Sequence, residues 1–272
     1  MDWLPWVRPT AEALPGPETV PDAVARLVAG NRQYAEDVAR CACDLPHPHP
    51  TPQRQAPFGA VLGCSDARVP LELVFGAGPN QLFVVRVAGN VLGDECLGSI
   101  EYALHNFESS LRVLVVLGHS GCGAVSAAVD VYLSPKHAVG IAFSRSLRTV
   151  VNHILVAVRS AALSLEQAWG ADVAEDPHYR DALVELAVPL NAAITAYQLR
   201  QELKTHQTGG PDVAYGVFDL ASARVAGPPD LDSVGLSPAP ATPEELVELG
   251  VQLARSPAVT RHLHLITGPF PD

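Results

Sequence analysis

The sequence predicts an α/β protein with a central, mostly parallel β-sheet flanked by helices, an N-terminal helical arm and a C-terminal helical appendage. The main observation is that short apolar runs alternate with helical patterns along the chain, with short links between them. The second observation is composition, because 48% of the 272 residues are hydrophobic and 17% are charged. This is enough apolar material for one substantial core with a small appendage.

Three short apolar runs predict buried strands, at Phe58–Gly63, Gln81–Ala88 and Leu111–Leu117. Gly118 is expected to end the third strand. One helix is predicted from Asp94, as its N-cap, to Phe107, and another begins near Gly121. Strands and helices joined in this way form parallel sheets with right-handed crossovers, so ligands are expected beyond the carboxyl ends of the strands.

The rest of the chain predicts an arm, more helices and a sheet extension. Pro21–Arg40 has the apolar pattern of a helix, and the proline-rich segment Leu45–Pro57 separates it from the core. The further expected elements are a helical stretch over Ile141–Lys204 with an interruption at Gly170–Pro177, strands at Val213–Leu220 and Ala223–Val225, and a capped helix from Thr242 to about Ser256.

The segment Gly227–Pro240 is rich in proline, aspartate and serine, which predicts a linker. We therefore expect residues 1–226 to form the main domain with its N-terminal arm. Residues 227–272 are expected to form a linker and an appendage to which the sequence assigns no role, and whose removal would leave the core folded.

Charge and hydropathy exclude two classes of partner. The formal net charge is −11 and no cluster of lysine and arginine is present, so nucleic-acid binding is not expected. No run of about 18 consecutive apolar residues occurs, so no membrane association is expected. The first ten residues contain Asp2, Pro5 and Pro9 and lack the pattern of a signal peptide, which predicts a cytoplasmic protein.

Five cysteines in a chain without a secretory signal favour metal binding or catalysis over a disulfide framework. Cys41 and Cys43 lie among prolines and histidines, and we expect them to be exposed loop thiols. Cys96 is expected to be packed in a helix. The two other cysteines follow predicted strands or turns and are candidates for chemistry.

The candidate metal ligands are Cys64, His119 and Cys122. Cys64 follows the first strand, His119 comes 55 residues later after the third strand, and Cys122 is three positions further on. His119 and Cys122 flank a turn into a helix, so both can reach a metal that Cys64 approaches from a neighbouring strand. Two thiolates and one imidazole favour Zn²⁺, and three ligands leave the fourth position open, as in catalytic zinc sites.

Asp66 and Arg68 are the candidate catalytic pair because they stand just after the first ligand. Asp66 can accept a hydrogen bond from a zinc-bound hydroxide, and Arg68 can hold the carboxylate in a bidentate pair. A simple loop ion pair is the commoner meaning of Asp-x-Arg in proteins, but closeness to a zinc ligand favours the functional role.

Four motifs in order along the chain resemble those of the β-class carbonic anhydrases. They are Gly63-Cys64-Ser65-Asp66-Ala67-Arg68-Val69, Phe83-Val84-Val85-Arg86 with Ala88-Gly89-Asn90, Glu101-Tyr102-Ala103, and Gly118-His119-Ser120-Gly121-Cys122-Gly123-Ala124. The similarity runs from about Val24 to Val225, and Gln55 matches the amide donor of the plant-like branch. Val87, where the family usually has asparagine, is a departure that touches no ligand.

The resemblance implies a zinc lyase that catalyses the reversible hydration of carbon dioxide to bicarbonate and a proton by a zinc-bound hydroxide. It implies that Gln55, Phe83, Ala88, Tyr102 and Gly123 bind the substrate in a largely apolar pocket. It also implies at least a homodimer, in which Gln55 reaches the zinc of the neighbouring chain.

Two alternatives stay open. Relatives with the same ligands hydrolyse carbon disulfide or carbonyl sulfide on this scaffold and differ mainly in access to the pocket. The other alternative is a non-catalytic zinc or redox-sensing module, which would use Cys41, Cys43 and the appendage. The presence of both Asp66 and Arg68 argues against such a module.

Overall fold

The computed structural model describes residues 19–40, 54–134, 136, 139, 144–206 and 211–264, which belong to two units. The first unit is Met1–Gln55 with Gly78–Asn80, and it contains helix α1 (Val20–Arg40). The helix predicted over Pro21–Arg40 is therefore confirmed. Cys41 and Cys43, predicted to be loop thiols, lie outside the described residues.

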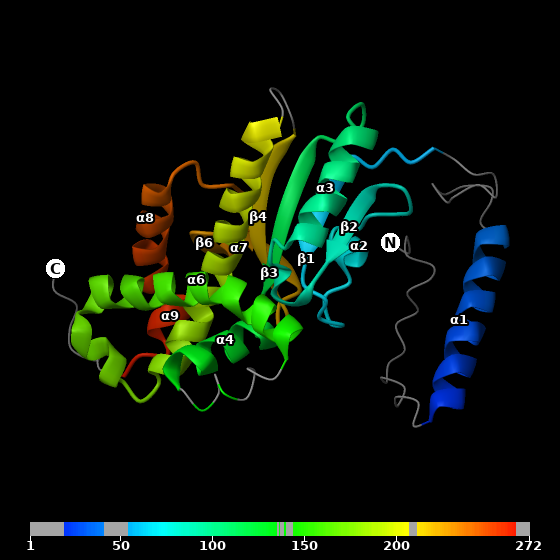
Figure 1. The fold of residues 1–272 in the computed structure, drawn as a ribbon. Helices are drawn as coiled ribbons and strands as arrows, with labels where there is room; N and C mark the ends of the chain where they lie inside the picture. Colours follow the sequence, from blue (N-terminus) through cyan, green and yellow to red (C-terminus); the bar gives the residue numbers. More distant parts are fainter. Residues whose placement is uncertain are drawn as a thin grey trace. The chain divides into compact units, whose positions relative to one another are not determined.

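The second unit, Ala56–Ala77 with Gln81–Asp272, contains the sheet and the other described helices (Figure 1). Its strands are β1 (Gly59–Gly63), β2 (Leu82–Arg86), β3 (Val113–His119), β4 (Asp212–Asp219), β5 (Arg224–Gly227), β6 (Asp230–Val234) and β7 (Ser237–Pro238). Its α-helices are α2 (Leu71–Val74), α3 (Asp94–Asn106), α4 (Gly123–Leu133), α6 (Arg145–Trp169), α7 (Tyr179–His206), α8 (Pro243–Ala254) and α9 (Pro257–Thr260). Two 3₁₀ helices, η1 (Ala88–Asn90) and η2 (Ala171–Glu175), complete the described elements.

The described strands form one sheet in the order β2-β1-β3-β4-β5-β6, with β7 also paired to β4. The strands β2, β1, β3 and β4 run parallel to one another, whereas β5, β6 and β7 pair antiparallel. In this register Gly63 of β1 lies beside Arg86 of β2 and Leu117 of β3. The predicted α/β class with a mostly parallel sheet is confirmed.

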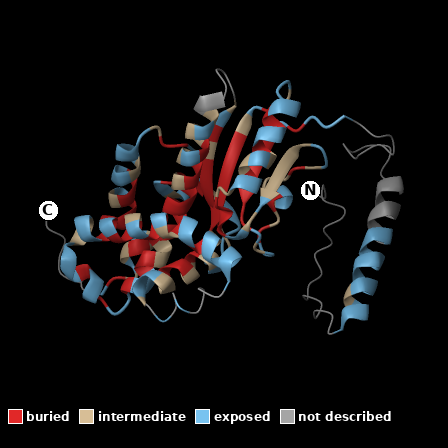
Figure 2. Ribbon diagram, viewed as in Figure 1, coloured by how far each residue is buried: buried red, intermediate tan, exposed pale blue. Residues whose placement is uncertain are grey.

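Alternate residues of the central strands enter two apolar layers. Leu62 and Leu114 pack with α3, α4, α6, α7 and α8 on one face, and Val61 and Val115 pack with residues around α2 on the other. Buried residues accordingly fill β1 and most of β3 and β4 and line the inner sides of the core helices, whereas β2 is only partly buried (Figure 2). Parallel strands covered on both faces must be apolar throughout, which explains why their sequences are continuous apolar runs.

Helix α7 supplies much of the larger layer. Its stretch Tyr179–Leu203 is long and apolar enough to cross a membrane by length and composition alone. Most of this stretch is buried, and the helix packs against β3, β4, α4 and α6. Burial against the sheet accounts for its apolar composition.

Two local predictions are wrong. The third strand does not end at Gly118 but continues to His119 in register with β4. A Cβ at Gly118 would come within 3.3 Å of the Ala192 Cβ on α7, so the glycine permits close helix–strand packing. The N-cap of α3 is Gly93, and Asp94 instead lies in the first turn, where its charge favours the helix N-terminus.

The predicted linker at Gly227–Pro240 is also wrong, and the expected division at residue 226 is not found. This segment forms β6 and β7, which extend the sheet beside β5 and β4. The helix predicted after Thr242 is present as α8, with Thr242 Oγ1 accepting the Glu245 N–H at 3.3 Å. Its Leu253 is buried in the same core as the sheet. Short strands joined by proline and aspartate turns have the composition of a linker, which explains the error.

Replacing Leu253 tests whether α8 belongs to the core. Leu253 is 0% exposed, so Leu253→Ala should lower the free energy of unfolding by about 2–5 kcal/mol through lost burial and a new cavity. Val247, on the same helix, is 50% exposed, and Val247→Ala should change this energy by less than about 1 kcal/mol. Denaturant unfolding of the full chain measures both values. Equal, small effects would mean that α8 is a separate appendage.

Candidate metal centre

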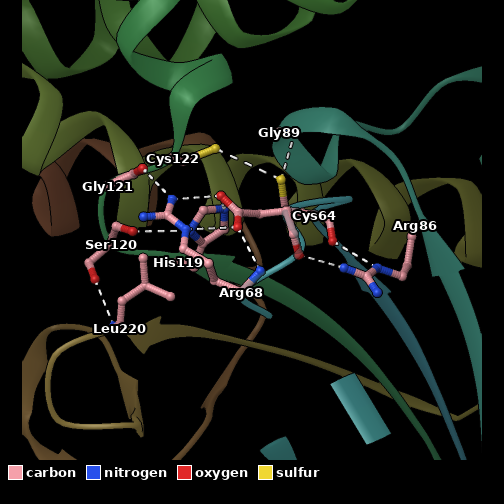
Figure 3. A network of polar contacts seen from close by, with 10 residues as sticks. Cys64, Arg68, Arg86, Gly89, His119, Ser120, Gly121, Cys122 and Leu220 are labelled. Carbon is pink, nitrogen blue, oxygen red and sulfur yellow. Dashed lines mark hydrogen bonds and ion pairs between the residues drawn. The ribbon is translucent and has the colours of Figure 1, made fainter. Parts of the chain in front are cut away.

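Three side chains with metal-binding atoms meet at the carboxyl edge of the sheet (Figure 3). Cys64 directly follows β1, His119 ends β3, and Cys122 is the residue before α4. Their ligand atoms all lie within 4.8 Å of one another, and all three residues are buried. The two Sγ atoms are 4.0 Å apart, which is too far for a disulfide and leaves both thiols free.

The imidazole of His119 presents one nitrogen to this group. Its Nδ1 lies 3.0 Å from the Ser120 carbonyl oxygen, so a proton on Nδ1 is donated to that carbonyl. Nε2 then carries the lone pair, and it is buried without a hydrogen-bond partner among the described residues. An unpaired buried nitrogen costs about 1–3 kcal/mol, which a metal ion bound to Nε2 would offset. The residues present therefore fit a metal ion.

The charges around the two thiols favour a cation. The pKa of Cys64 is lowered because the sulfur accepts hydrogen bonds from the Cys122 thiol and from the Gly89 N–H at 3.3 Å. The pKa of Cys122 is raised because its thiol donates to Cys64 and is buried. Burial lowers the pKa of His119, but the nearby Cys64 and Asp66 outweigh burial and raise it above its ordinary value. A bound metal ion would displace the proton that the two thiols share.

Arg68 holds the Asp66 carboxylate beside the ligands. The Arg68 backbone N–H and Nε both donate to Asp66 Oδ1 at 2.9 Å, and Nη2 donates to Oδ2 at 2.7 Å. Asp66 Oδ2 lies 3.9 Å from His119 Nε2. The Arg68 hydrogen bonds hold the pKa of the Asp66 carboxyl well below its usual range, so the carboxylate is ionised at neutral pH.

Two arginines connect the loops that carry the ligands. Arg86, at the end of β2, donates through Nε to the Cys64 carbonyl at 3.0 Å and through Nη2 to the Asp66 carbonyl at 2.6 Å. Arg68 Nη2 also donates to the Gly121 carbonyl at 3.3 Å. Arg86 was not among the predicted site residues, although its position at the end of a predicted strand, in the Phe83-Val84-Val85-Arg86 motif, was a signal for it.

Ser120 and Asp219 form a second group that the sequence analysis missed. Ser120 Oγ donates to Asp219 Oδ1 and accepts the Leu220 N–H, both at 2.9 Å. Asp219 also accepts the backbone N–H groups of Ala221 and Ser222. Hydrogen bonds from Ser222 and Ser120 outweigh partial burial and lower the pKa of Asp219 to about 2. The available signal was the place of Asp219 at the carboxyl end of a predicted strand.

Two of the predicted substrate-binding residues belong to an aromatic group on β2 and α3. The ring centroids of Phe83 and Tyr102 are 6.3 Å apart, and both rings also pack on Phe107, at 5.8 Å and 6.0 Å. Tyr102 is 54% exposed, so this group has a solvent-facing side in the single chain.

The other three predicted substrate-binding residues are all exposed. Ala88 begins η1 and precedes Gly89, whose N–H donates to Cys64. Gly123 begins α4 directly after Cys122. Gln55 belongs to the first unit, so its predicted role stays a prediction.

Comparisons with known proteins identify a family for this chain. A family model described as "Carbonic anhydrase" matches residues 59–225, more than half of the chain. A carbonic anhydrase of Mycolicibacterium smegmatis is 40% identical over 109 residues, covering 40% of this chain and 49% of that protein. "Carbonic anhydrase 2" of Mycobacterium tuberculosis is 39% identical over 104 residues, covering 38% and 46%. The chain thus spans about half the length of the curated relatives it matches.

Solved structures show the same fold. A β-carbonic anhydrase of Aspergillus fumigatus covers 86% of this chain and 99% of its own, with a TM-score of 0.58 and 23% identity. A tetrameric β-carbonic anhydrase of Sordaria macrospora covers 76% and 96%, with a TM-score of 0.53 and 20% identity. From the family match, the ordered motifs and this fold, the chain belongs to the β-class carbonic anhydrase family.

Proposed function

We propose that the protein is a zinc-dependent carbonic anhydrase, which catalyses the reversible hydration of carbon dioxide to bicarbonate and a proton. The observation that carries this proposal is the buried Cys64, His119 and Cys122 group, with an unpaired His119 Nε2, in a chain of this family. Two sulfur ligands and one imidazole are a donor set that favours zinc. Three protein ligands match catalytic rather than structural zinc sites.

A zinc ion held by these residues would lower the pKa of a coordinated water and so supply a nucleophile at neutral pH. The protein's own contribution begins with Asp66. Arg68 gives Asp66 Oδ1 two hydrogen bonds but gives Oδ2 only one, so Oδ2 keeps a second acceptor site. Oδ2, 3.9 Å from His119 Nε2, can therefore accept the O–H of the nucleophile and orient its lone pair toward carbon dioxide.

Carbon dioxide is apolar and small, so its site needs apolar walls and few donors. We assign Phe83, Ala88, Tyr102 and Gly123 to these walls. Gln55 of a second chain would be the hydrogen-bond donor. The exposed side of the Phe83 and Tyr102 group supports a partner chain there. The exposed Val20, Val24 and Leu27 on α1 support the same assembly, because an amphipathic helix needs an apolar surface to cover it. The active unit is therefore at least a homodimer.

The metal assignment predicts that Cys122→Ala loses zinc. Two remaining protein ligands hold zinc weakly, so zinc and carbon dioxide hydration should disappear together. Cys96→Ala is the matched control, because Cys96 is also a buried free cysteine but lies on α3. Elemental analysis of the purified variants measures the zinc content. One zinc per chain in Cys122→Ala, or zinc loss in Cys96→Ala, would contradict the ligand assignment.

The role of Asp66 predicts that Asp66→Asn keeps zinc but lowers turnover by about 10²-fold, because the amide can turn its NH₂ toward the nucleophile and lose the charged acceptor. Asp130→Asn is the control, since Asp130 forms a similar bidentate pair with Arg180 at 2.7 Å and 3.1 Å. Stopped-flow hydration of carbon dioxide measures turnover, with carbon disulfide and carbonyl sulfide as parallel substrates. If the zinc-loaded wild type hydrates carbon dioxide no faster than the uncatalysed reaction, the proposed activity is wrong. Unchanged turnover in Asp66→Asn would remove only Asp66 from the mechanism.

The shared pocket predicts complementation between two inactive chains. A Gln55→Ala chain lacks the donor and a Cys64→Ser chain lacks a metal ligand, so a mixed dimer would contain one intact pocket. After random exchange of equal amounts, about half of the dimers are mixed, and two-fold symmetry gives each mixed dimer one intact pocket. Mixing should therefore restore activity up to about one intact site for every two dimers. A mixture of Cys64→Ser and Cys122→Ala chains is the control, because no intact metal site can form. Confirmed subunit exchange without recovered activity would mean that each pocket lies within one chain.

A further inference from the structure

The chain between two of the metal-site residues is attached to the sheet at Ser120. The Ser120 N–H donates to the Phe218 carbonyl at 2.9 Å, which continues the pairing of β3 with β4 beyond His119. Gly121 then turns the chain with φ at +63°, and Cys122 follows. Ser120 is thus the last point before the turn at which β4 holds the segment from His119 to Cys122.

The Ser120 carbonyl sets how the His119 ring is held. His119 Nδ1 lies 3.0 Å from this oxygen, so the direction of the carbonyl fixes the protonated nitrogen and the plane of the ring. Nε2 has no hydrogen-bond partner among the described residues that could orient the ring from the other side. The ring therefore depends on the orientation of the Ser120 peptide group.

The Ser120 side chain fixes that peptide group through β4. Its hydroxyl accepts the Leu220 N–H at 2.9 Å (Figure 3). The same hydroxyl donates to Asp219 Oδ1, also at 2.9 Å, so it has one partner on either side. Asp219 is itself held by the Ser222 N–H at 2.9 Å and the Ala221 N–H at 3.3 Å. A carboxylate with this many donors has a fixed orientation, so its hydrogen bond with the Ser120 hydroxyl also fixes the position of that hydroxyl.

We propose that Asp219 is a positioning residue for the metal site, which acts through the Ser120 hydroxyl to hold the Ser120 carbonyl and thereby direct His119 Nε2 at the metal. The inference rests on the proposed zinc site. Groups that orient a metal-binding histidine in this way typically contribute about 10- to 100-fold to metal affinity. Asp219 contacts neither metal nor substrate, so its effect should appear in metal binding even without turnover.

The test uses Asp219→Ala, Asp219→Asn and Ser120→Ala in the full chain. Asp219→Ala and Ser120→Ala should each raise the dissociation constant for zinc by about 10- to 100-fold, and should change the visible spectrum of the Co²⁺-substituted protein. Asp219→Asn keeps an acceptor for the Ser120 hydroxyl and should fall between wild type and Asp219→Ala. The double Ser120→Ala/Asp219→Ala variant should lose no more affinity than the worse single variant, because both act along one path.

The matched control is Asp230→Ala. Asp230 also closes a turn, accepting the Asp232 N–H at 3.0 Å and the Ser233 N–H at 3.2 Å, but at the start of β6. Asp230→Ala should leave the zinc dissociation constant and the Co²⁺ spectrum unchanged. Thermal unfolding of the metal-free variants then separates a loss of turn stability from a loss of metal positioning.

Chelator competition measures the dissociation constants, and the outcomes separate the two proposals. A wild-type chain that binds no zinc would defeat the proposed function. If the wild-type chain binds zinc, and Ser120→Ala and Asp219→Asn both have the same zinc affinity and Co²⁺ spectrum as the wild type, only the role of Asp219 is overturned. Should Asp219→Ala fail to fold, Ser120→Ala decides the question, because it leaves the Asp219 turn bonds to Ala221 and Ser222 in place.

Discussion

The parallel pairing of β1 with β3 is the constraint on which the rest of the site depends. The register that places Gly63 beside Leu117 also places Cys64 and His119 beyond the same edge of the sheet. Without that pairing the two residues are separated by 55 positions of chain and have no reason to meet. The turn at Gly121 then needs to bring only Cys122 back toward them.

Helix α7, on the larger apolar face of the sheet, supports the positions of Cys64 and His119. Gly118 allows α7 to approach β3 next to His119, and Asn191 of the same helix donates to the Gly89 carbonyl at 2.8 Å. The Gly89 N–H in turn donates to Cys64. One core helix therefore supports both strand ends that carry ligands.

The C-terminal segment belongs to this core although the family match ends at residue 225. Strands β6 and β7 add to the sheet, and α8 packs closely on α6 because Gly250 leaves room for the Ser164 side chain. Trp169 Nε1 donates to the Ala254 carbonyl at 3.0 Å and connects the end of α6 to the end of α8. Beyond α9, the His264 N–H donates to the Asp176 carboxylate at 2.6 Å, and this carboxylate, at the end of η2, also accepts the His178 N–H at 2.8 Å. These contacts make the segment a structural continuation of the family fold in this chain.

The sequence by itself determined the α/β class, the main elements and the identity of the residues gathered at the metal site. Apolar runs, helix caps and adjacent residues such as Asp66 and Arg68 act over a few positions, so local patterns predict them. The tertiary structure alone decided three other features: the continuation of β3 through Gly118 beside β4, the pairing of β7 with β4, and the bond from Ser120 to Asp219. Each depends on groups that are far apart in the chain, as Ser120 and Asp219 are by 99 positions. Glycine, proline and aspartate read as breaks or linkers in a sequence, and only the packing around them shows that here they permit close contact or turn a strand.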